Sequence, residues 1–167
     1  MSYKRFRYVM LESASQSSAT YMPPNGNLAN HWLVERLPEG IIRCTRLARQ
    51  YVSEAEAEEV LAALNGQLPV ENRHEFSILL DARLTPAPSN DPAIDATIVR
   101  YRKLLFERFA AAAILVKTAA GTMQVWRQAK QDGVTYRVFN KEDAVLEYLA
   151  DCVRIRRQLE NDHVTSW

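Results

Sequence analysis

An apolar run that ends in an acidic residue and a proline-rich loop constrains this chain more than any other feature. The run is Phe76–Leu80, followed by Asp81 and by the loop at 84–91, which contains Pro86 and Pro88. A short apolar run bounded by polar residues is typical of a strand that is buried on both faces. Loops at the carboxyl ends of strands in open α/β sheets commonly carry the functional site. We therefore expect a buried central strand with the functional site in the loop that follows it.

Predicted strands and helices alternate around this run. Two apolar arms, 32–37 and 41–47, flank Pro38-Glu39-Gly40, whose residue types favour a type I turn. Further strands are predicted at 111–117 and 135–139, and helices at 53–68, 92–109, 119–132 and after Asn140. We expect Met123, Trp126 and Ala129 on the inward face of the third helix. The order predicts an α/β fold with a mainly parallel five-stranded sheet, an antiparallel first strand and four helices.

The chain is predicted to divide into three segments. Residues 1–30 are an N-terminal extension in which Lys4 to Leu11 could form a strand, residues 31–151 are the domain proper, and residues 152–167 extend the last helix. Ile155 and Leu159 continue the apolar stripe of this helix beyond what four core helices require. Because exposed apolar positions often mark a contact surface, we expect a homo-oligomer formed through the C-terminal helix.

The composition is that of an ordinary globular protein. Hydrophobic residues make up 47% of the 167 residues and charged residues 25%, with a net charge of +1, which gives no reason to expect nucleic acid or a membrane surface as the main partner. No apolar run approaches the length of a transmembrane segment, and the run after the basic N-terminus is too short for a signal peptide. Cys44 and Cys152 lie outside any C-x-x-C spacing and are interpreted as buried thiols. We expect a cytoplasmic protein.

Motifs of catalysis are missing from the sequence. His31, His74 and His163 lie in three different segments without the spacing of metal ligands. The chain has no G-x-S-x-G, P-loop or G-x-G-x-x-G pattern. We therefore expect no catalytic residues, no metal and no cofactor. A hydrolase or transferase that uses Asp81 and the 85–91 loop remains an alternative, and it would require a concave polar pocket at that loop.

The chain resembles a STAS domain over roughly residues 30–151. The resemblance rests on the order and lengths of the predicted elements, on Phe76–Asp81 ahead of the longest loop, and on Gly133-Val134 ahead of Val138-Phe139. STAS is the fold of bacterial anti-sigma-factor antagonists, and Sec14-like lipid-binding modules share its general plan. The resemblance implies a non-enzymatic regulatory module that docks a protein partner, such as a regulatory kinase or a scaffold, through the loop and helix after the third strand.

The resemblance also directs attention to the start of that helix. The antagonists carry a phosphorylatable serine there beside an aspartate and a glycine; this chain has Ser89-Asn90-Asp91-Pro92, with the aspartate after the serine and no glycine. Asp81 matches the acidic end of the strand. Ser89 is the candidate for phosphorylation, and the residues predicted to bind the partner are Thr85, Ser89, Asn90, Asp91, Arg100 and Lys103. The alternative is a Sec14-like binder of a lipid or small apolar ligand, which would need a pocket beneath a mobile helix.

Overall fold

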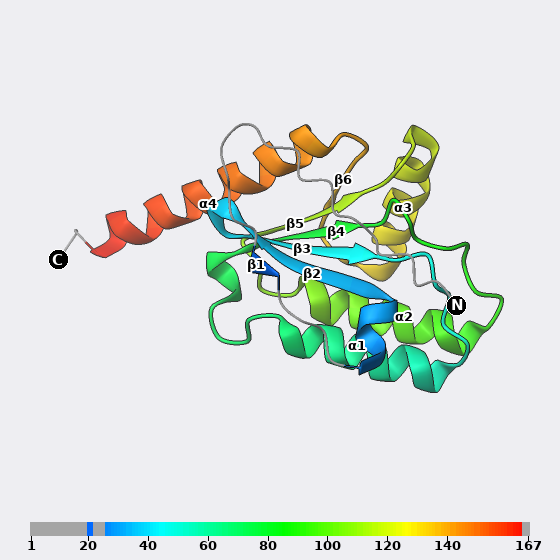
Figure 1. Ribbon diagram of the computed structural model, residues 1–167. Coiled ribbons are helices and arrows are strands. Elements are labelled where there is room, and N and C mark those ends of the chain that lie inside the picture. The colour runs from blue at the N-terminus through cyan, green and yellow to red at the C-terminus, as the bar shows by residue number, and fades with distance from the viewer. Residues whose placement is uncertain (1–19, 22–25, 165–167) are drawn as a thin grey trace, which may run out of the picture.

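Six strands form one sheet in the computed structural model, which describes residues 20–21 and 26–164 (Figure 1). The strands follow one another across the sheet in chain order: β1 (Thr20–Tyr21), β2 (Trp32–Leu37), β3 (Ile41–Arg46), β4 (Ser77–Asp81), β5 (Ala111–Leu115) and β6 (Arg137–Phe139). The helices are α1 (Glu54–Gln67), α2 (Pro92–Phe106), α3 (Ala119–Asp132) and α4 (Glu142–Val164). The predicted strand at 4–11 lies outside the described residues.

The predicted fold class is confirmed. The pairs β1–β2 and β2–β3 are antiparallel, and β3 to β6 run parallel to one another. The four helices and the five predicted strands are present, and the two-residue β1 extends the sheet. The predicted type I turn of the β2–β3 hairpin is wrong, because Glu39 has a φ of 63°, where a type I turn requires a negative value. Gly40 is also left-handed, and a Cβ there would lie 3.3 Å from the carbonyl oxygen of Glu75.

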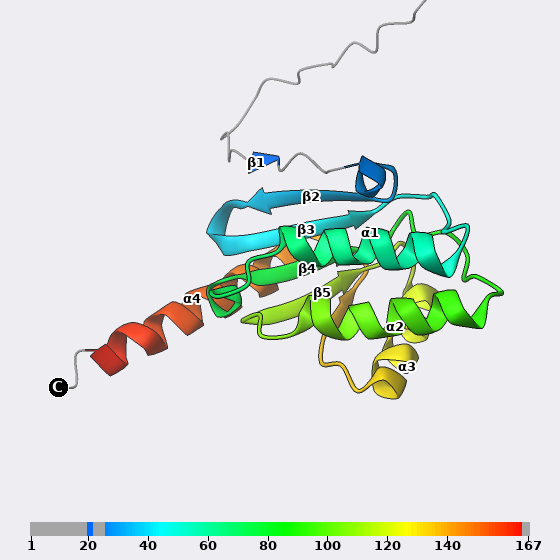
Figure 2. The ribbon, with the colours of Figure 1, turned by 90° about the horizontal axis from the view of Figure 1, so that it is seen from below.

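Helices cover both faces of the sheet (Figures 1 and 2). One face carries Ile42, Ile78 and Ile114, which pack with apolar side chains of α1 and α2. The other face carries Leu79 and Leu115, which pack against α4. Ile78 and Leu79, neighbours in β4, are almost completely buried on opposite faces. The central strand is therefore buried on both sides, as the apolar run predicts.

Local sequence signals explain where α1 and α2 begin. The Ser53 side chain accepts a hydrogen bond from the backbone N–H of Glu56 and caps α1. Asp91 accepts one from the N–H of Ala93 and caps α2, which starts at Pro92. The α2 helix ends at Phe106, three residues earlier than predicted, and Arg108 takes a left-handed φ of 70°.

The third and fourth helices differ more from expectation. Met123 and Trp126 are 55% and 48% exposed, so the predicted inward face of α3 is wrong; Val125 packs on the core instead, because α3 reaches the body beside the edge strand β6. The Ala129 side chain lies outside the described part.

The last turns of α4 project beyond the sheet, with Ile155 and Leu159 more than half exposed (Figure 2). Cys44 is buried but Cys152 is partly exposed, which corrects the expectation of two buried thiols.

Candidate functional site

A cavity of about 380 Å³ lies at the carboxyl ends of the parallel strands, beneath the loop at 84–92. We call it the loop cavity. Thr85 to Ser89 border it on one side, α2 and the start of the loop after β3 border it on others, and Val125 of α3 also lines it. Its position agrees with the rule that ligands bind at the carboxyl edge of open α/β sheets, and its volume falls in the lower part of the usual range for ligand pockets, about 300–1,000 Å³.

The walls of the loop cavity are mainly apolar and aromatic. Side chains from two strands and three helices contribute to the aliphatic part of the wall: Leu61, Leu80, Ile94, Ile98, Ile114 and Val125. Four aromatic rings complete it: Trp32, Tyr51, Phe106 and Tyr136. The Trp32 indole N–H donates to the Tyr51 hydroxyl at 3.0 Å, which satisfies the polar atom of Trp32. A wall of this kind suits an apolar ligand.

One fully charged side chain lies deep in this wall. Arg46, the last residue of β3, is 5% exposed and lines the loop cavity. Its guanidinium lies 4.5 Å from the Tyr51 ring centroid and 5.5 Å from that of Trp32. It donates to the carbonyl oxygens of His31, Leu47 and Arg49 at 3.0, 2.9 and 2.6 Å. Burial lowers the pKa of Arg46.

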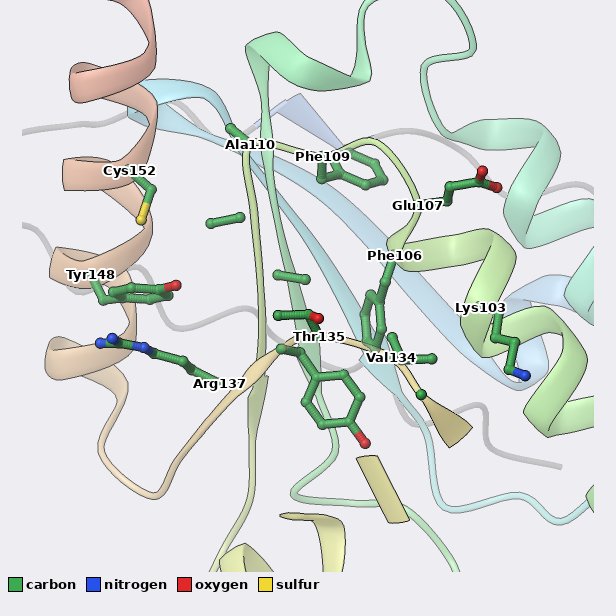
Figure 3. Close-up of a pocket in the computed structure, with 14 residues that line it drawn as sticks. Lys103, Phe106, Glu107, Phe109, Ala110, Val134, Thr135, Arg137, Tyr148 and Cys152 are labelled. Carbon is green, nitrogen blue, oxygen red and sulfur yellow. The ribbon is translucent and has the colours of Figure 1, made fainter. Parts of the chain in front are cut away.

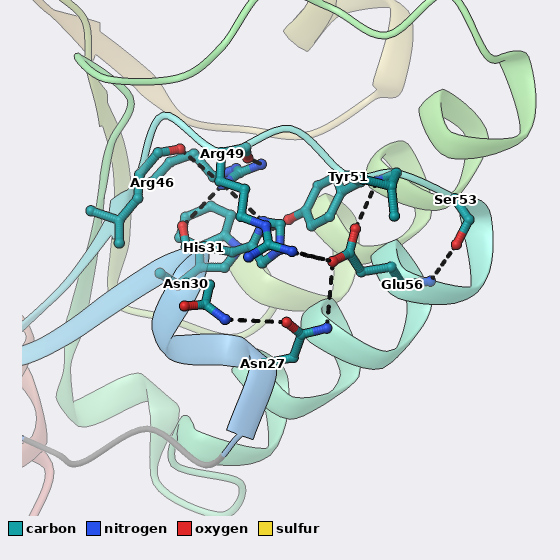
Figure 4. Close-up of polar contacts among 11 residues, drawn as sticks. Asn27, Asn30, His31, Arg46, Arg49, Tyr51, Ser53 and Glu56 are labelled. Carbon is teal, nitrogen blue, oxygen red and sulfur yellow. Dashed lines mark hydrogen bonds and ion pairs between the residues drawn. The ribbon is translucent and has the colours of Figure 1, made fainter.

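A polar network behind Arg46 holds this part of the wall in place (Figure 4). His31 is fully buried, stacks on Tyr51 with ring centroids 4.8 Å apart, and contacts Glu56 through Nε2 at 3.3 Å. The Glu56 carboxylate also accepts from the backbone N–H of Val52 at 2.7 Å. That backbone bond and the contact with His31 lower the pKa of Glu56, whereas burial and the charge of Arg46 lower the pKa of His31. The network fixes the start of α1 beside the cavity.

The residues predicted to bind a partner are spread over the length of α2 and the loop before it. Thr85 and Ser89 border the loop cavity, while Asn90 and Asp91 are exposed at the start of α2. The Ser89 hydroxyl accepts from the N–H of Asp91 at 3.0 Å, so Asp91 rather than Ser89 caps the helix. 

The two basic members of that set take up separate positions. Arg100 pairs with Glu58 of α1, whose other carboxylate oxygen accepts from the Tyr101 hydroxyl at 2.6 Å. Lys103 is exposed near the far end of α2, where it borders a different cavity. The structure thus brings Thr85 and Ser89 to the loop cavity and sets Arg100 and Lys103 apart from it.

Asp81 lies on the opposite face of the sheet from the loop cavity, together with Leu79. It accepts hydrogen bonds from Arg43 at 2.5 Å and from Arg83 at 2.9 and 2.7 Å. Both arginines also pair with Glu142, each at 2.8 Å. Burial alone would raise the pKa of Asp81, but the hydrogen bonds from Arg83 and Arg43 lower it. The two arginines and two carboxylates neutralise one another and join β3, β4 and α4.

A second, wider cavity of about 690 Å³ lies at the edge of the sheet where β5 begins (Figure 3). We call it the edge cavity. Phe106 and Phe109 lie on one side of it and Tyr148 and Cys152 of α4 on the other. It exists because β6 pairs only with Ala113–Leu115, so the first two residues of β5 have no strand beside them there. Its position at the amino end of β5 makes it the weaker candidate for a ligand site.

The sequence does not identify Trp32, Arg46 or Tyr51 as site residues, although one signal points to Arg46. In a strand, residues two apart share a face. Arg46 therefore shares the buried face of β3 with Ile42 and Cys44, and an arginine at such a position is unusual. No comparable signal exists for Tyr51, which lies in a loop and reaches the cavity only through the tertiary fold.

Comparison with models of protein families, with curated proteins and with solved structures gave no match for this chain. None of the helices in the described ranges combines the length and apolarity that a membrane span requires. Within those same ranges, no three or more His, Cys, Asp or Glu side chains gather closely enough to hold a metal ion. The function is therefore argued from the loop cavity itself.

Proposed function

We propose that this protein is a non-enzymatic binding protein that holds a small, largely apolar ligand in the loop cavity. The observation that carries the proposal is the cavity: about 380 Å³, at the carboxyl ends of the parallel strands, with aliphatic and aromatic walls. Apolar surface that leaves water on binding contributes roughly 25 cal/mol per Å² before the costs of association are subtracted. A ligand that fills the cavity would therefore gain its affinity mainly from contact with these walls.

The loop at 84–92 has the properties of a cover for such a ligand. Pro86 and Pro88 restrict its backbone, which lowers the entropy lost when a ligand orders it. Gln50, in the loop after β3, donates to the carbonyl oxygen of Ala87 at 3.3 Å. This hydrogen bond is exposed to solvent, and a bond of that kind contributes only about 1 kcal/mol. The two loops can therefore separate at small cost to admit a ligand.

Docking of a protein partner through the same loop is the second candidate. Leu84 is 56% exposed, and Thr85, Asn90 and Asp91 are also exposed, so a partner could contact them directly. Because Ser89 borders the cavity from the same loop, a ligand and a partner would act on one segment of the chain. This candidate keeps the regulatory role that the STAS resemblance implies, with Ser89 as the residue whose charge would control docking.

Filling the cavity with a larger side chain tests the proposal. Ile98 lines the loop cavity from α2, and Leu104 is exposed on the same helix outside it. We expect Ile98→Trp to weaken binding of the neutral apolar dye Nile red by about tenfold or more, since the indole occupies the ligand's space. Leu104→Trp is the matched control and should bind the dye as the wild type does. Fluorescence titration measures both, and thermal unfolding shows that each variant is folded.

Two results would contradict the proposal. The first is a wild-type protein that does not bind Nile red at all. The second is equal loss of binding in the folded Ile98→Trp and Leu104→Trp variants, which would place the dye on the surface of α2. Native mass spectrometry of protein purified from its own cells adds an independent readout, because a retained ligand appears as added mass.

A further inference from the structure

Arg46 carries a buried positive charge that no acidic side chain of the described residues neutralises through an ion pair. Three of its hydrogen-bond partners are backbone carbonyl oxygens, and the fourth is the ring nitrogen Nδ1 of His31, which lies 3.5 Å from its Nη1. The carboxylate of Glu56 pairs with His31 and Arg49, so its interaction with Arg46 is electrostatic and involves no hydrogen bond. A buried charge without a counter-charge costs several kcal/mol unless something compensates it.

Arg73 is a second buried arginine, and its contacts show how backbone carbonyl groups compensate a buried positive charge. Arg73 also donates to backbone oxygens, including that of Leu104 at 2.6 Å and that of Glu107 at 3.4 Å. Those two carbonyls lie at the carboxyl end of α2, where the helix dipole favours a positive charge. The carbonyls around Arg46 belong to His31, Leu47 and Arg49, which lie outside the helices. Arg46 lines the loop cavity, whereas Arg73 lines neither the loop cavity nor the edge cavity.

We infer that the ligand of the loop cavity carries a carboxylate, and that Arg46 is its counter-charge. This inference rests on the proposed function. The guanidinium presents five N–H donors, and the three carbonyl groups engage Nη1 and Nη2 but not Nε. A carboxylate can accept from the remaining N–H groups while its apolar body contacts the aromatic and aliphatic walls. The ligand class is thus a small amphipathic acid with an aliphatic or aromatic body.

Matched acids and alcohols separate the role of the charge from that of the apolar body. Decanoate is compared with decan-1-ol, and 2-naphthoate with 2-naphthylmethanol, each by displacement of Nile red from the wild-type protein. A charge-assisted hydrogen bond in a buried site contributes roughly 1.5–3 kcal/mol. We therefore expect at least one acid to bind about tenfold more tightly than its alcohol. The pair that shows the preference identifies the body as aliphatic or aromatic.

Variants then assign the preference to a residue. Arg46→Met should remove this preference, so that the acid and its alcohol bind the variant with affinities within about threefold of each other. Arg46→Lys keeps the charge but not the planar fork, and should keep part of the preference. Arg102→Met is the control, because Arg102 lines the same cavity from α2. If Arg46→Met does not fold, the comparison of Arg46→Lys with Arg102→Met still decides between the two arginines.

The outcomes distinguish this inference from the proposal on which it rests. A protein that binds each acid and its alcohol equally keeps the proposed function and overturns the inference. A preference for acids that disappears in Arg102→Met and persists in the Arg46 variants overturns it as well. If no acid and no alcohol displaces the dye and the dye itself does not bind, the proposed function fails.

Discussion

At the scale of single residues, His31 makes the stability of this protein depend on pH near neutrality. Its pKa in the folded protein lies below the ordinary value of 6.5, so folding favours the neutral ring. That contribution to stability is complete above about pH 6.5 and is lost as the pH falls through the lowered pKa. Asp81 and Glu56 also have lowered pKa values, and their contributions are lost only in more acidic solution.

The prediction is a loss of stability in two steps as the solution is acidified. Between about pH 6.5 and about pH 5.5 the free energy of unfolding of the wild type should fall, whereas that of His31→Gln, which cannot gain a proton, should change less. Urea unfolding at each pH provides the measurement. Identical pH profiles for the two proteins in this range would show that His31 does not titrate on unfolding.

At the scale of elements, the loop before α2 and the first turn of that helix decide whether the site is also a docking surface. A negative charge on Ser89 would lie near the amino-terminal end of α2, where the helix dipole favours it. It would also replace the neutral hydroxyl group that accepts a hydrogen bond from the backbone N–H of Asp91. Because this loop covers the cavity, the charge should change which partners bind.

We therefore expect Ser89→Asp and Ser89→Ala to retain different partners in a pull-down from the native cells, with the wild type matching one of them. Leu84→Ser, in the exposed part of the same loop, should reduce capture of any protein that docks there. The substituted positions lie outside the buried core, and thermal unfolding shows whether each variant is folded. If the captured proteins are the same in every case, the loop covers the cavity without docking a partner.

Local patterns account for the elements that could be predicted from the sequence. The apolar run of β4, the Ser53 cap of α1 and the Asp91-Pro92 start of α2 each depend on neighbouring residues only. The inward face of α3 was mispredicted because that helix meets the body at the edge of the sheet, where only part of one face is covered. The walls of the loop cavity come from strands and helices that are distant in the chain, so the sequence directs attention to the loop that borders the cavity but not to Arg46, Trp32 or Tyr51.

At the scale of the whole molecule, the projecting end of α4 exposes apolar side chains that contacts within the single chain do not explain. Ile155 and Leu159 lie one turn apart on it, and both are more than half exposed. Burial of these side chains between two copies would stabilise a dimer, as the apolar stripe predicts. Arg154, Arg156 and Arg157 precede Glu160 and Asp162, so an antiparallel pair of these helices would place the basic part of one beside the acidic part of the other.

Light scattering tests this arrangement in solution. We expect the full chain to have the mass of a dimer, and a chain that ends after Asp151 to have the mass of a monomer. Ile155→Asp with Leu159→Asp should give the same result without shortening the helix, because both side chains lie outside the core. Equal monomeric masses for the full and shortened chains would contradict the prediction.

The most direct test of the central claim, that the loop cavity holds an apolar ligand, is a titration followed by NMR of isoleucine methyl groups. Ile94, Ile98 and Ile114 line the cavity, Ile41 lies on the opposite face of the sheet, and Ile155 lies on the projecting end of α4. We predict that decanoate shifts the methyl signals of the three cavity residues and leaves those of Ile41 and Ile155 unchanged. Signals that shift only at Ile155, or at none of the five residues, would contradict the account.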